Sequence, residues 1–340
     1  MRQVKVEEAV GQVLCHDMTQ IIPGEFKGAR FRKGHIVAPE DIEVLRSMGK
    51  RSIYVWDLAP GMVHENDAAR QLCELAQGAG CVVTGDIKEG KIELTAAYDG
   101  CFRVRSEALR AVNNVEQVMV ATRHGNTAVS SGDKLAGMRV IPLVIAQEVL
   151  DQARAAAGHE PLCEVVPFTL TRAGIVTTGS EVAEGLIEDA FTPVVACKLS
   201  AFGIEVVAHE LPGDDVDEVA AAIARVREAG VDLVICTGGM SVDPDDNTPG
   251  AIRRSGAEMV TYGAPVLPGA MLFVGYFADG TPVLGLPGCV MFAGATIFDL
   301  VLPRVAAGIR LTRADIVAYG EGGLCLGCAE CRYPICPFGK

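Results

Sequence analysis

Residues 232–241 decide the fold, and they read Asp-Leu-Val-Ile-Cys-Thr-Gly-Gly-Met-Ser. An aliphatic run followed at once by two glycines predicts a buried strand that ends in a tight turn. Two similar stretches occur elsewhere in the same half of the chain. Residues 174–178 (Gly-Ile-Val-Thr-Thr) run into Gly179, and residues 283–286 (Val-Leu-Gly-Leu) run into Pro287-Gly288. Three predicted strands therefore end in glycine-containing turns.

Helices are predicted between these strands. Residues 214–229 begin with acidic residues, repeat apolar residues on one helical face, and are followed by Gly230, which are start and stop signals for a helix. Further helices are predicted over 191–202 and 291–306, with a strand over 204–208. Alternating strands and helices indicate an α/β fold: a three-layer domain with a mostly parallel sheet, covered by helices on both faces.

The chain has 340 residues, enough for two or three domains. Residues 1–60 alternate short apolar segments with glycine and proline turns, and we expect a small N-terminal region there. Residues 61–167 mix helical and strand-like segments and predict a mixed α+β middle domain. The α/β domain is expected over 168–311, and a cysteine-rich tail over 312–340.

The composition excludes several classes of function. There are 30 Lys and Arg against 43 Asp and Glu, a net charge of −13, with no compact basic run, which argues against nucleic acid and anionic membranes as partners. Aromatic residues make up only 5%, too few for a base-stacking platform. The N-terminus lacks the apolar core of a signal peptide. The charge-free stretch 259–278 holds too many glycines and prolines to favour a membrane span. We expect a soluble, cytoplasmic protein.

The three turns predict a ligand site, because ligands of open α/β sheets bind beyond the carboxyl ends of the strands. Glycine there lets backbone N–H groups approach a ligand, and the following helix N-terminus favours an anion. One such turn could serve backbone geometry alone. Three in one domain favour a site for a phosphorylated small molecule. The turn residues are Thr178, Gly179, Ser180, Gly238, Gly239, Ser241, Pro287 and Gly288.

An acidic segment follows the second turn. Asp243, Asp245 and Asp246 would repel a bound phosphate unless a divalent cation such as Mg²⁺ mediated, so they are candidate metal ligands or acid–base groups. The alternative is that the carboxylates are solvated and Thr248 caps a helix that begins at Pro249. The pair Asp214-Asp215 fits the capping interpretation better.

The tail carries four of the twelve cysteines. Cys325, Cys328, Cys331 and Cys336 have the spacing C-x2-C-x2-C-x4-C-P, which without a secretory signal favours metal binding over disulfides. The run is one residue longer than that of bacterial ferredoxins, and structural zinc more often uses two separated CxxC pairs. An iron–sulfur cluster, Zn²⁺ and plain or redox-active thiols all stay open. The six histidines show no ligand spacing and are interpreted as surface or core residues.

Residues 172–308 resemble the molybdopterin-binding domain shared by MoeA, MogA and gephyrin. Four motifs carry the resemblance and occur in the family's order. They are Thr177-Thr178-Gly179-Ser180-Glu181, Thr237-Gly238-Gly239-Met240-Ser241, Asp246-Asn247-Thr248-Pro249 and Leu286-Pro287-Gly288. The first 58 residues bear a weaker resemblance to the start of MoeA.

The resemblance implies binding of molybdopterin, or adenylylated molybdopterin, through its terminal phosphate. Gly238, Gly239 and Ser241 would contact that phosphate. The other pocket residues would be Thr178, Gly179, Ser180, Thr248, Pro287 and Gly288. MoeA proteins insert molybdate into the dithiolene and hydrolyse the adenylate with a divalent metal, so Glu181, Asp245 and Asp246 become candidate catalytic residues, with Mg²⁺ near Asp243. MoeA proteins form homodimers with the site between subunits, and the same is expected here.

Two departures from MoeA keep a second function open. The N-terminal stretch 23–28 has Glu25 but lacks the family's Asn-Ser-Ala-Met-Asp-Gly sequence, and few residues follow Gly308 where MoeA has a further domain. The chain is therefore predicted to be a molybdopterin molybdotransferase or, alternatively, a non-catalytic carrier of molybdopterin or mature cofactor for a client molybdoenzyme. A different nucleotide-processing enzyme on the same domain is a third possibility.

Overall fold

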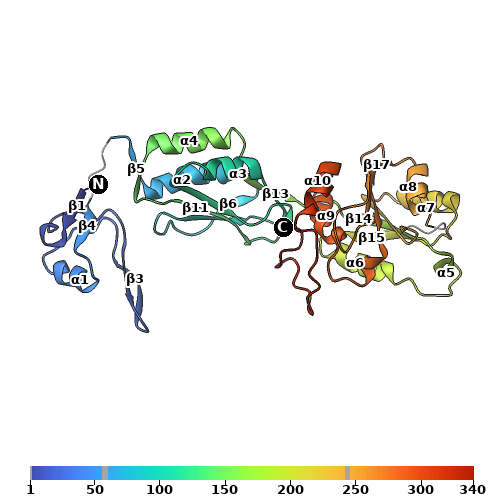
Figure 1. Ribbon diagram of the computed structural model, residues 1–340, viewed down its shortest axis with the longest axis horizontal. Helices are drawn as coiled ribbons and strands as arrows, with labels where there is room; N and C mark the ends of the chain where they lie inside the picture. Colours follow the sequence, from blue (N-terminus) through green and yellow to red (C-terminus); the bar gives the residue numbers. More distant parts are fainter. Residues whose placement is uncertain (1, 56–59, 242–245) are drawn as a thin grey trace. The chain divides into compact units, whose positions relative to one another are not determined.

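The computed structural model describes residues 2–55, 60–241 and 246–340, and the chain divides into two compact units (Figure 1). Unit 1 comprises residues 1–98, 103–123 and 131–165. Unit 2 comprises residues 99–102, 124–130 and 166–340. Each unit is described by itself.

Unit 1 begins with a small region that has its own core. Strand β1 (Arg2–Lys5) pairs antiparallel with β4 (Ser52–Val55), and β2 (Met18–Ile22) forms a hairpin with β3 (Phe26–Phe31). The 3-10 helix η1 (Val6–Glu8) and helix α1 (Asp41–Ser47) complete it. Its buried side chains include Val6, Leu14, Val37, Leu45 and Ile53.

The rest of unit 1 is a four-stranded antiparallel sheet with helices on one face (Figure 1). The strand order is β6 (Cys81–Val83), β7 (Ile92–Ala96), β11 (Lys134–Val140), β9 (Val118–Thr122). The helices are α2 (Glu65–Ala76), α3 (Ser106–Asn113) and α4 (Gln147–Ala157). Short strands β5 (Met62–His64) and β12 (Val144–Ala146) pair with each other and lead directly into α2 and α4.

Unit 2 is built on a six-stranded sheet in the order β15-β14-β16-β19-β18-β17. Strands β14 (Arg172–Thr177), β15 (Glu205–Glu210), β16 (Leu233–Thr237) and β19 (Pro282–Leu286) are parallel. Strands β17 (Glu258–Tyr262) and β18 (Phe273–Tyr276) extend the sheet antiparallel. Strand β10 (Thr127–Val129) also lies in unit 2, whereas β8 (Gly100–Val104) and β13 (Cys163–Pro167) have residues in both units.

Helices cover both faces of this sheet. One core contains Ile175, Ile235 and Leu284 with side chains of α6 (Phe191–Ser200) and α9 (Ile297–Ala306). The other contains the alternate strand residues Val176 and Val234, with side chains of α7 (Val216–Glu228) and α8 (Thr248–Arg254). Consecutive strand residues point to opposite faces, so each strand contributes to both cores. The predicted α/β class with a mostly parallel, doubly covered sheet is confirmed.

The helix predicted over 291–306 begins later than expected. Residues Gly288–Met291 form the 3-10 helix η2, and α9 starts only at Ile297. The reason is a capping box, in which the Thr296 side chain accepts from the helix backbone and the Asp299 carboxylate accepts from the Thr296 N–H, at 2.7 Å. Thr296 therefore fixes the helix start, which leaves residues 292–295 as a loop between η2 and α9.

The tail packs along unit 2 after α10 (Arg313–Val317) and η3 (Ala318–Gly320). The Cys325 N–H donates to the Leu267 carbonyl at 2.8 Å, and the Tyr333 hydroxyl donates to the Asp299 carbonyl at 2.9 Å. Phe338 is buried in the core beside α9.

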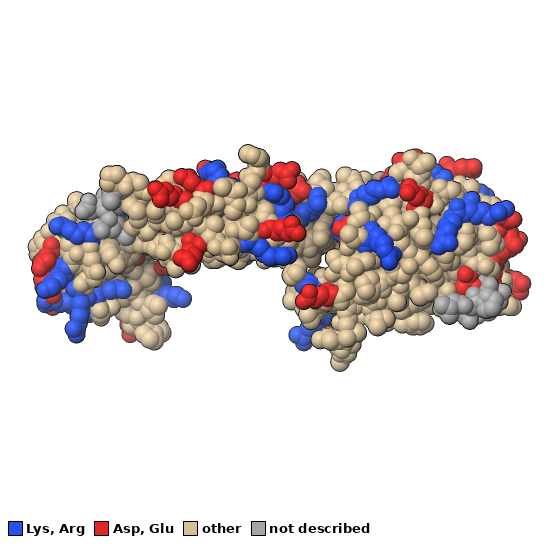
Figure 2. Space-filling view, turned by 45° about the horizontal axis from the view of Figure 1, so that its top comes forward, with Lys and Arg blue, Asp and Glu red and all other residues tan. Residues whose placement is uncertain are grey.

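Acidic and basic side chains are interspersed over the face of unit 2 that Figure 2 presents. Within the described ranges, no helix is both long and apolar enough to cross a membrane.

Candidate functional site

The carboxyl ends of three neighbouring strands lie in register. Thr177 at the end of β14 pairs with Thr237 at the end of β16, and Thr237 pairs with Leu286 at the end of β19. The turns that follow these residues, 178–180, 238–241 and 287–288, consequently leave the same edge of the sheet. Sequence reasoning predicted three turns at one edge, and the structure places them there.

Hydrogen bonds join the first two turns. The Thr178 N–H donates to the Thr237 carbonyl at 2.8 Å. The Thr178 hydroxyl lies 3.0 Å from the Thr248 hydroxyl, on the first residue of α8. All three threonines are buried. The first strand end, the second strand end and the start of α8 therefore form one hydrogen-bonded assembly.

The second turn requires glycine at both positions. Gly238 and Gly239 have φ angles of +81° and +54°, a region that favours glycine. A Cβ on Gly238 would lie 2.2 Å from the Thr178 carbonyl oxygen, and one on Gly239 would lie 2.7 Å from the Thr248 hydroxyl oxygen. Gly288 in the third turn differs, because a Cβ there would meet no heavy atom within 4 Å.

The first turn is held by Asp214. The Ser180 N–H and hydroxyl both donate to Asp214 Oδ2, at 2.9 and 2.7 Å. Its neighbour Asp215 caps α7 by accepting from the N–H groups of Asp217 and Glu218. The expected helix cap is thus confirmed for Asp215 and wrong for Asp214, because Asp214 turns away from the helix toward the first turn.

The acidic segment is only partly described. Asp243 and Asp245 lie outside the described residues, and Asp246 is half-buried. In the alternative interpretation of this segment Thr248 would cap α8, and the structure contradicts that part of it. Thr248 lies inside the helix after Asn247, and its buried side chain bonds to Thr178 instead. Glu181 lies on the short helix α5 (Ser180–Ala183) and is exposed.

No metal-ligand set is assembled by the side chains that the structure describes, since no three His, Cys, Asp or Glu residues there are placed to hold an ion. This covers the tail cysteines, whose predicted shared metal is not supported. The tail is held along the surface at separate points: Cys325 by its bond to Leu267, Cys331 against Gly294, and Cys336 against the core of unit 2. The predicted Mg²⁺ likewise finds no ligand set in the described residues.

A polar cluster beneath the first turn escaped the sequence analysis. The Thr177 hydroxyl lies 3.2 Å from Asp189 Oδ2 and 3.3 Å from His209 Nε2, and Thr192 bridges the latter two. Burial raises the pKa of Asp189, but hydrogen bonds from the Thr192 hydroxyl and from backbone N–H groups outweigh it and hold that pKa below its usual value. Thr177 lies at the end of β14, so the cluster extends polar groups to the base of the candidate site.

No local signal marked these residues. Asp189 lies in an irregular segment, and His209 shows no ligand spacing. Tyr262, on β17, was missed for the same reason. Its hydroxyl donates to the carbonyls of Met240 and Ser241, at 2.8 and 3.2 Å. Burial, together with the Asp246 carboxylate, raises the pKa of Tyr262, so the phenol remains a donor that holds the second turn.

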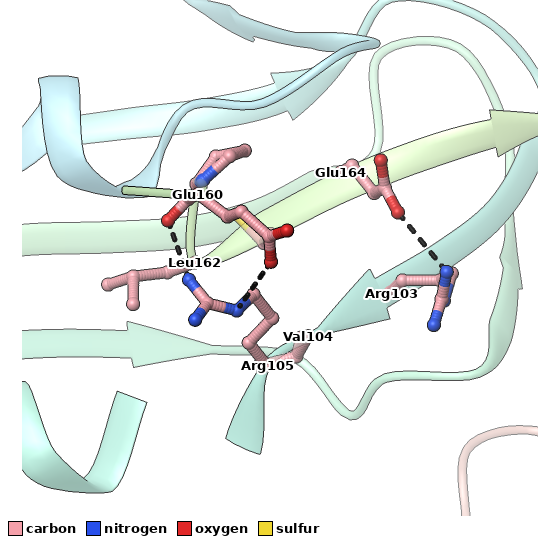
Figure 3. A pocket seen from close by; sticks show the side chains of 8 residues that line it. Arg103, Val104, Arg105, Glu160, Leu162 and Glu164 are labelled. Carbon is pink, nitrogen blue, oxygen red and sulfur yellow. Dashed lines mark hydrogen bonds and ion pairs between the residues drawn. The ribbon is translucent and has the colours of Figure 1, made fainter. Parts of the chain in front are cut away.

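A hollow of about 390 Å³ in unit 1 is lined by charged side chains that pair with one another (Figure 3). Its wall carries two ion pairs, Arg103 with Glu164 and Arg105 with Glu160, each at 3.4 Å. The Arg105 guanidinium also donates to the carbonyls of Ala157 and Glu160 at 3.0 and 2.6 Å. Arg105 therefore stabilises the carboxyl-terminal end of α4. Its positive charge is paired with the Glu160 carboxylate.

Residues 174–307 match the family described as "Probable molybdopterin binding domain". The matched segment runs from β14 through α9 and contains all three turns. Residues 3–57 match a different family, "Domain of unknown function (DUF8806)".

Curated relatives match over shorter stretches. A CinA-like protein of Mycolicibacterium vanbaalenii is 33% identical over 138 residues, which cover 38% of this chain and 33% of the relative. A CinA-like protein of Mycobacterium avium is 37% identical over 90 residues, 26% of this chain and 21% of the relative. The chain thus spans a third or less of these relatives.

Solved structures match with low identity. The molybdopterin biosynthesis enzyme MoaB of Thermus thermophilus is 22% identical, covering 41% of this chain and 98% of that protein, with a TM-score of 0.33. The tungsten cofactor synthesizing protein MoaB of Pyrococcus furiosus is also 22% identical, covering 36% and 84%, with a TM-score of 0.31.

Proposed function

We propose that unit 2 binds molybdopterin at the edge formed by β14, β16 and β19, and that the protein acts in molybdenum cofactor biosynthesis. The observation that carries this proposal is the Gly238-Gly239 turn. Both residues adopt conformations that favour glycine, and the turn lies inside the segment that matches the molybdopterin-binding family. Thr178, in the first turn, donates to the carbonyl of Thr237, directly before Gly238. A ligand phosphate can approach such a backbone closely.

The hydrogen bonds divide the candidate binding residues into two groups. Thr178, Ser180 and Thr248 already use their hydroxyls to join protein segments, so in this proposal they position the turns. Gly238, Gly239 and the exposed Ser241 would contact the phosphate. Gly179, Pro287 and Gly288 would border the rest of the ligand. In this way a rigid frame presents a short row of backbone and hydroxyl donors to the ligand.

The reaction proposed first is insertion of molybdate, with cleavage of adenylylated molybdopterin to release AMP, as in MoeA-type proteins. Asp246 follows the second turn and is the first candidate for orienting the attacking water. No step is assigned to Mg²⁺, because the described residues form no ligand set for it. A homodimer and a client molybdoenzyme belong to the same proposal.

A carrier without turnover is the second candidate, and one observation favours it. Glu181, a predicted catalytic residue, is exposed on the short helix α5. Such an edge could hold adenylylated molybdopterin tightly while leaving its phosphoanhydride intact. A carrier would also need no counterpart of the N-terminal MoeA sequence that residues 23–28 lack.

The deciding experiment incubates the full chain with adenylylated molybdopterin, with and without molybdate and Mg²⁺, and measures both ligand binding and AMP release. Molybdate-dependent AMP release that Asp246→Asn abolishes, with binding retained, would establish the insertase. Binding without release would establish the carrier. Absence of binding, in a sample whose folding is verified by circular dichroism, would exclude both. Gly250→Ala, on α8 and outside the turns, serves as the matched control.

A further inference from the structure

We propose that unit 1 contains a second ligand site, a cavity that binds a small zwitterion carrying one ammonium and one anionic group. The cavity has a volume of about 420 Å³ and lies at the start of α2. Basic and acidic side chains both line it: Lys33, Lys50 and Arg139, and Asp17, Glu65 and Glu89. The proposal is independent of the molybdopterin site, which lies in unit 2.

Glu65 provides the binding point for the ammonium group. The residue is only 6% exposed, yet among the described residues no donor forms a hydrogen bond with its carboxylate. Its nearest charge partner is Arg139, whose Nη2 lies 3.7 Å from Oε2, beyond hydrogen-bonding distance. A buried carboxylate without a donor is costly, and burial raises the pKa of Glu65. An ammonium in the cavity would supply the missing hydrogen bonds.

The other carboxylates of the wall are already engaged with protein groups. Asp17 Oδ1 accepts a hydrogen bond from the backbone N–H of Lys33 at 2.7 Å. Glu89 Oε1 accepts from the Thr19 hydroxyl at 2.8 Å. Glu65 is therefore the acidic residue that a ligand would meet. Gly90 keeps that position open, because a Cβ there would lie 2.6 Å from Glu65 Oε2.

Lys33 provides the binding point for the anionic group, and His64 fixes it. His64 is 1% exposed. Its Nε2 donates to the Cys15 carbonyl at 2.6 Å, and its Nδ1 accepts from the Asn66 N–H at 3.2 Å. The imidazole is therefore neutral, in agreement with burial, which lowers the pKa of His64. Since Nδ1 carries no proton, it also accepts from the Lys33 ammonium, at 3.2 Å.

His64 holds the Lys33 ammonium at the cavity wall, next to the amino-terminal end of α2. The positive charge of Lys33 and the helix dipole both favour an anion there. Lys50 lines the same cavity. The first 55 residues hold nine Lys and Arg against seven Asp and Glu in a chain whose net charge is −13. An anionic group is therefore favoured at this end, and an ammonium at Glu65.

The test is isothermal titration of the full chain at pH 7 with β-alanine, 4-aminobutyrate and O-phosphoethanolamine. Propionate and propylammonium serve as single-charge probes. At least one zwitterion is expected to bind about tenfold or more tightly than either single-charge probe, since a charged hydrogen bond contributes that much. Preference for O-phosphoethanolamine would identify phosphate as the anionic group, and preference for an amino acid would identify carboxylate. Failure of every zwitterion to bind, or equal binding of a single-charge probe, would overturn the proposal.

Matched variants separate binding from folding. Glu65→Gln keeps the shape of the side chain and is expected to lower the affinity for the zwitterion by about tenfold. Glu74→Gln lies on the same helix at an exposed position, paired with Arg154, and is expected to leave affinity unchanged. Thermal unfolding checks that both variants fold. Equal weakening by the two variants would overturn the assignment of Glu65. Molybdopterin binding by unit 2 should be unaffected in both, so this test and that of the proposed function fail independently.

Discussion

The hydroxyls of Thr178 and Thr248, seventy residues apart in the chain, lie 3.0 Å from each other behind the turn of Gly238 and Gly239. Both side chains are almost completely buried, and either hydroxyl can donate. The bond links the end of β14 to the start of α8 across the end of β16. The backbone that we propose binds phosphate is thereby fixed from both sides.

Removing one hydroxyl of this pair should destabilise unit 2. Thr248→Val leaves the Thr178 hydroxyl with a poorer set of partners and is expected to lower the free energy of unfolding by about 1 kcal/mol. Molybdopterin binding should weaken as well. Thr248→Ser keeps the hydroxyl and should retain binding. Chemical denaturation and ligand titration measure the two effects, and equal binding by the Val and Ser variants would contradict the positioning role.

Substituting glycine by alanine in the second turn should destabilise the protein far more than the same substitution nearby in α8. Gly239→Ala forces a left-handed backbone conformation on alanine and brings its Cβ close to the Thr248 hydroxyl, so a loss of about 1–3 kcal/mol is expected. Gly250→Ala is the control, because it lies within α8 and its Cβ would meet nothing within 4 Å. That change should be neutral or stabilising by about 0.5–1 kcal/mol. Thermal unfolding of the two variants distinguishes them.

Asp189 should stabilise the protein in a pH-dependent way. Its pKa in the folded state is lower than its usual value, so its contribution is present above about pH 4 and disappears as pH falls through the folded pKa. Asp189→Asn is expected to cost about 1.5 kcal/mol at pH 7. The difference from the original protein should shrink between pH 5 and pH 3, given the usual Asp pKa of about 3.9. A difference independent of pH, measured by urea denaturation, would show that the charge of Asp189 does not matter.

Glu65 should have the opposite pH dependence. Burial raises its pKa in the folded state, so its protonated form is favoured there. The resulting stability is present below the ordinary pKa of glutamate and is lost as pH rises through the raised value. Without ligand, Glu65→Gln should therefore unfold at a higher temperature than the original protein at pH 7, with a smaller advantage near pH 4.5. A destabilised Gln variant at pH 7 would indicate that the carboxylate is well satisfied in the protein.

The tail should contribute to stability through Phe338. This side chain is 3% exposed and packs edge-on against Tyr333, with ring centroids 6.3 Å apart. Phe338→Ala is expected to lower the free energy of unfolding by about 3 kcal/mol. Ile335→Ala removes a side chain that is 86% exposed in the same segment and should change it by less than about 0.5 kcal/mol. Similar losses in both variants would mean that the tail acts as a whole and not through Phe338.

Local patterns in the sequence determined the architecture of unit 2. The aliphatic runs at 174–178 and 232–237 and the capped helix over 214–229 each depend on neighbours within a few residues. The residue patterns of strands, helix caps and glycine turns depend on interactions between residues that are close in the sequence. The α/β class could therefore be predicted from the sequence. The carboxyl ends of parallel strands meet at one edge by topology, which is why the positions of the three turns could also be predicted.

Only the tertiary structure decided how side chains from distant segments combine. Asp214 looked like half of a helix cap, but it holds Ser180, and Thr248 looked like a cap but bonds to Thr178. Asp189 meets His209, and Glu65 and His64 meet the N-terminal region at one cavity. The sequence shows which hydrogen-bond partners a side chain has within its own helix or turn. A partner from a distant segment depends on how the helices and strands pack, so only the tertiary structure could show these contacts.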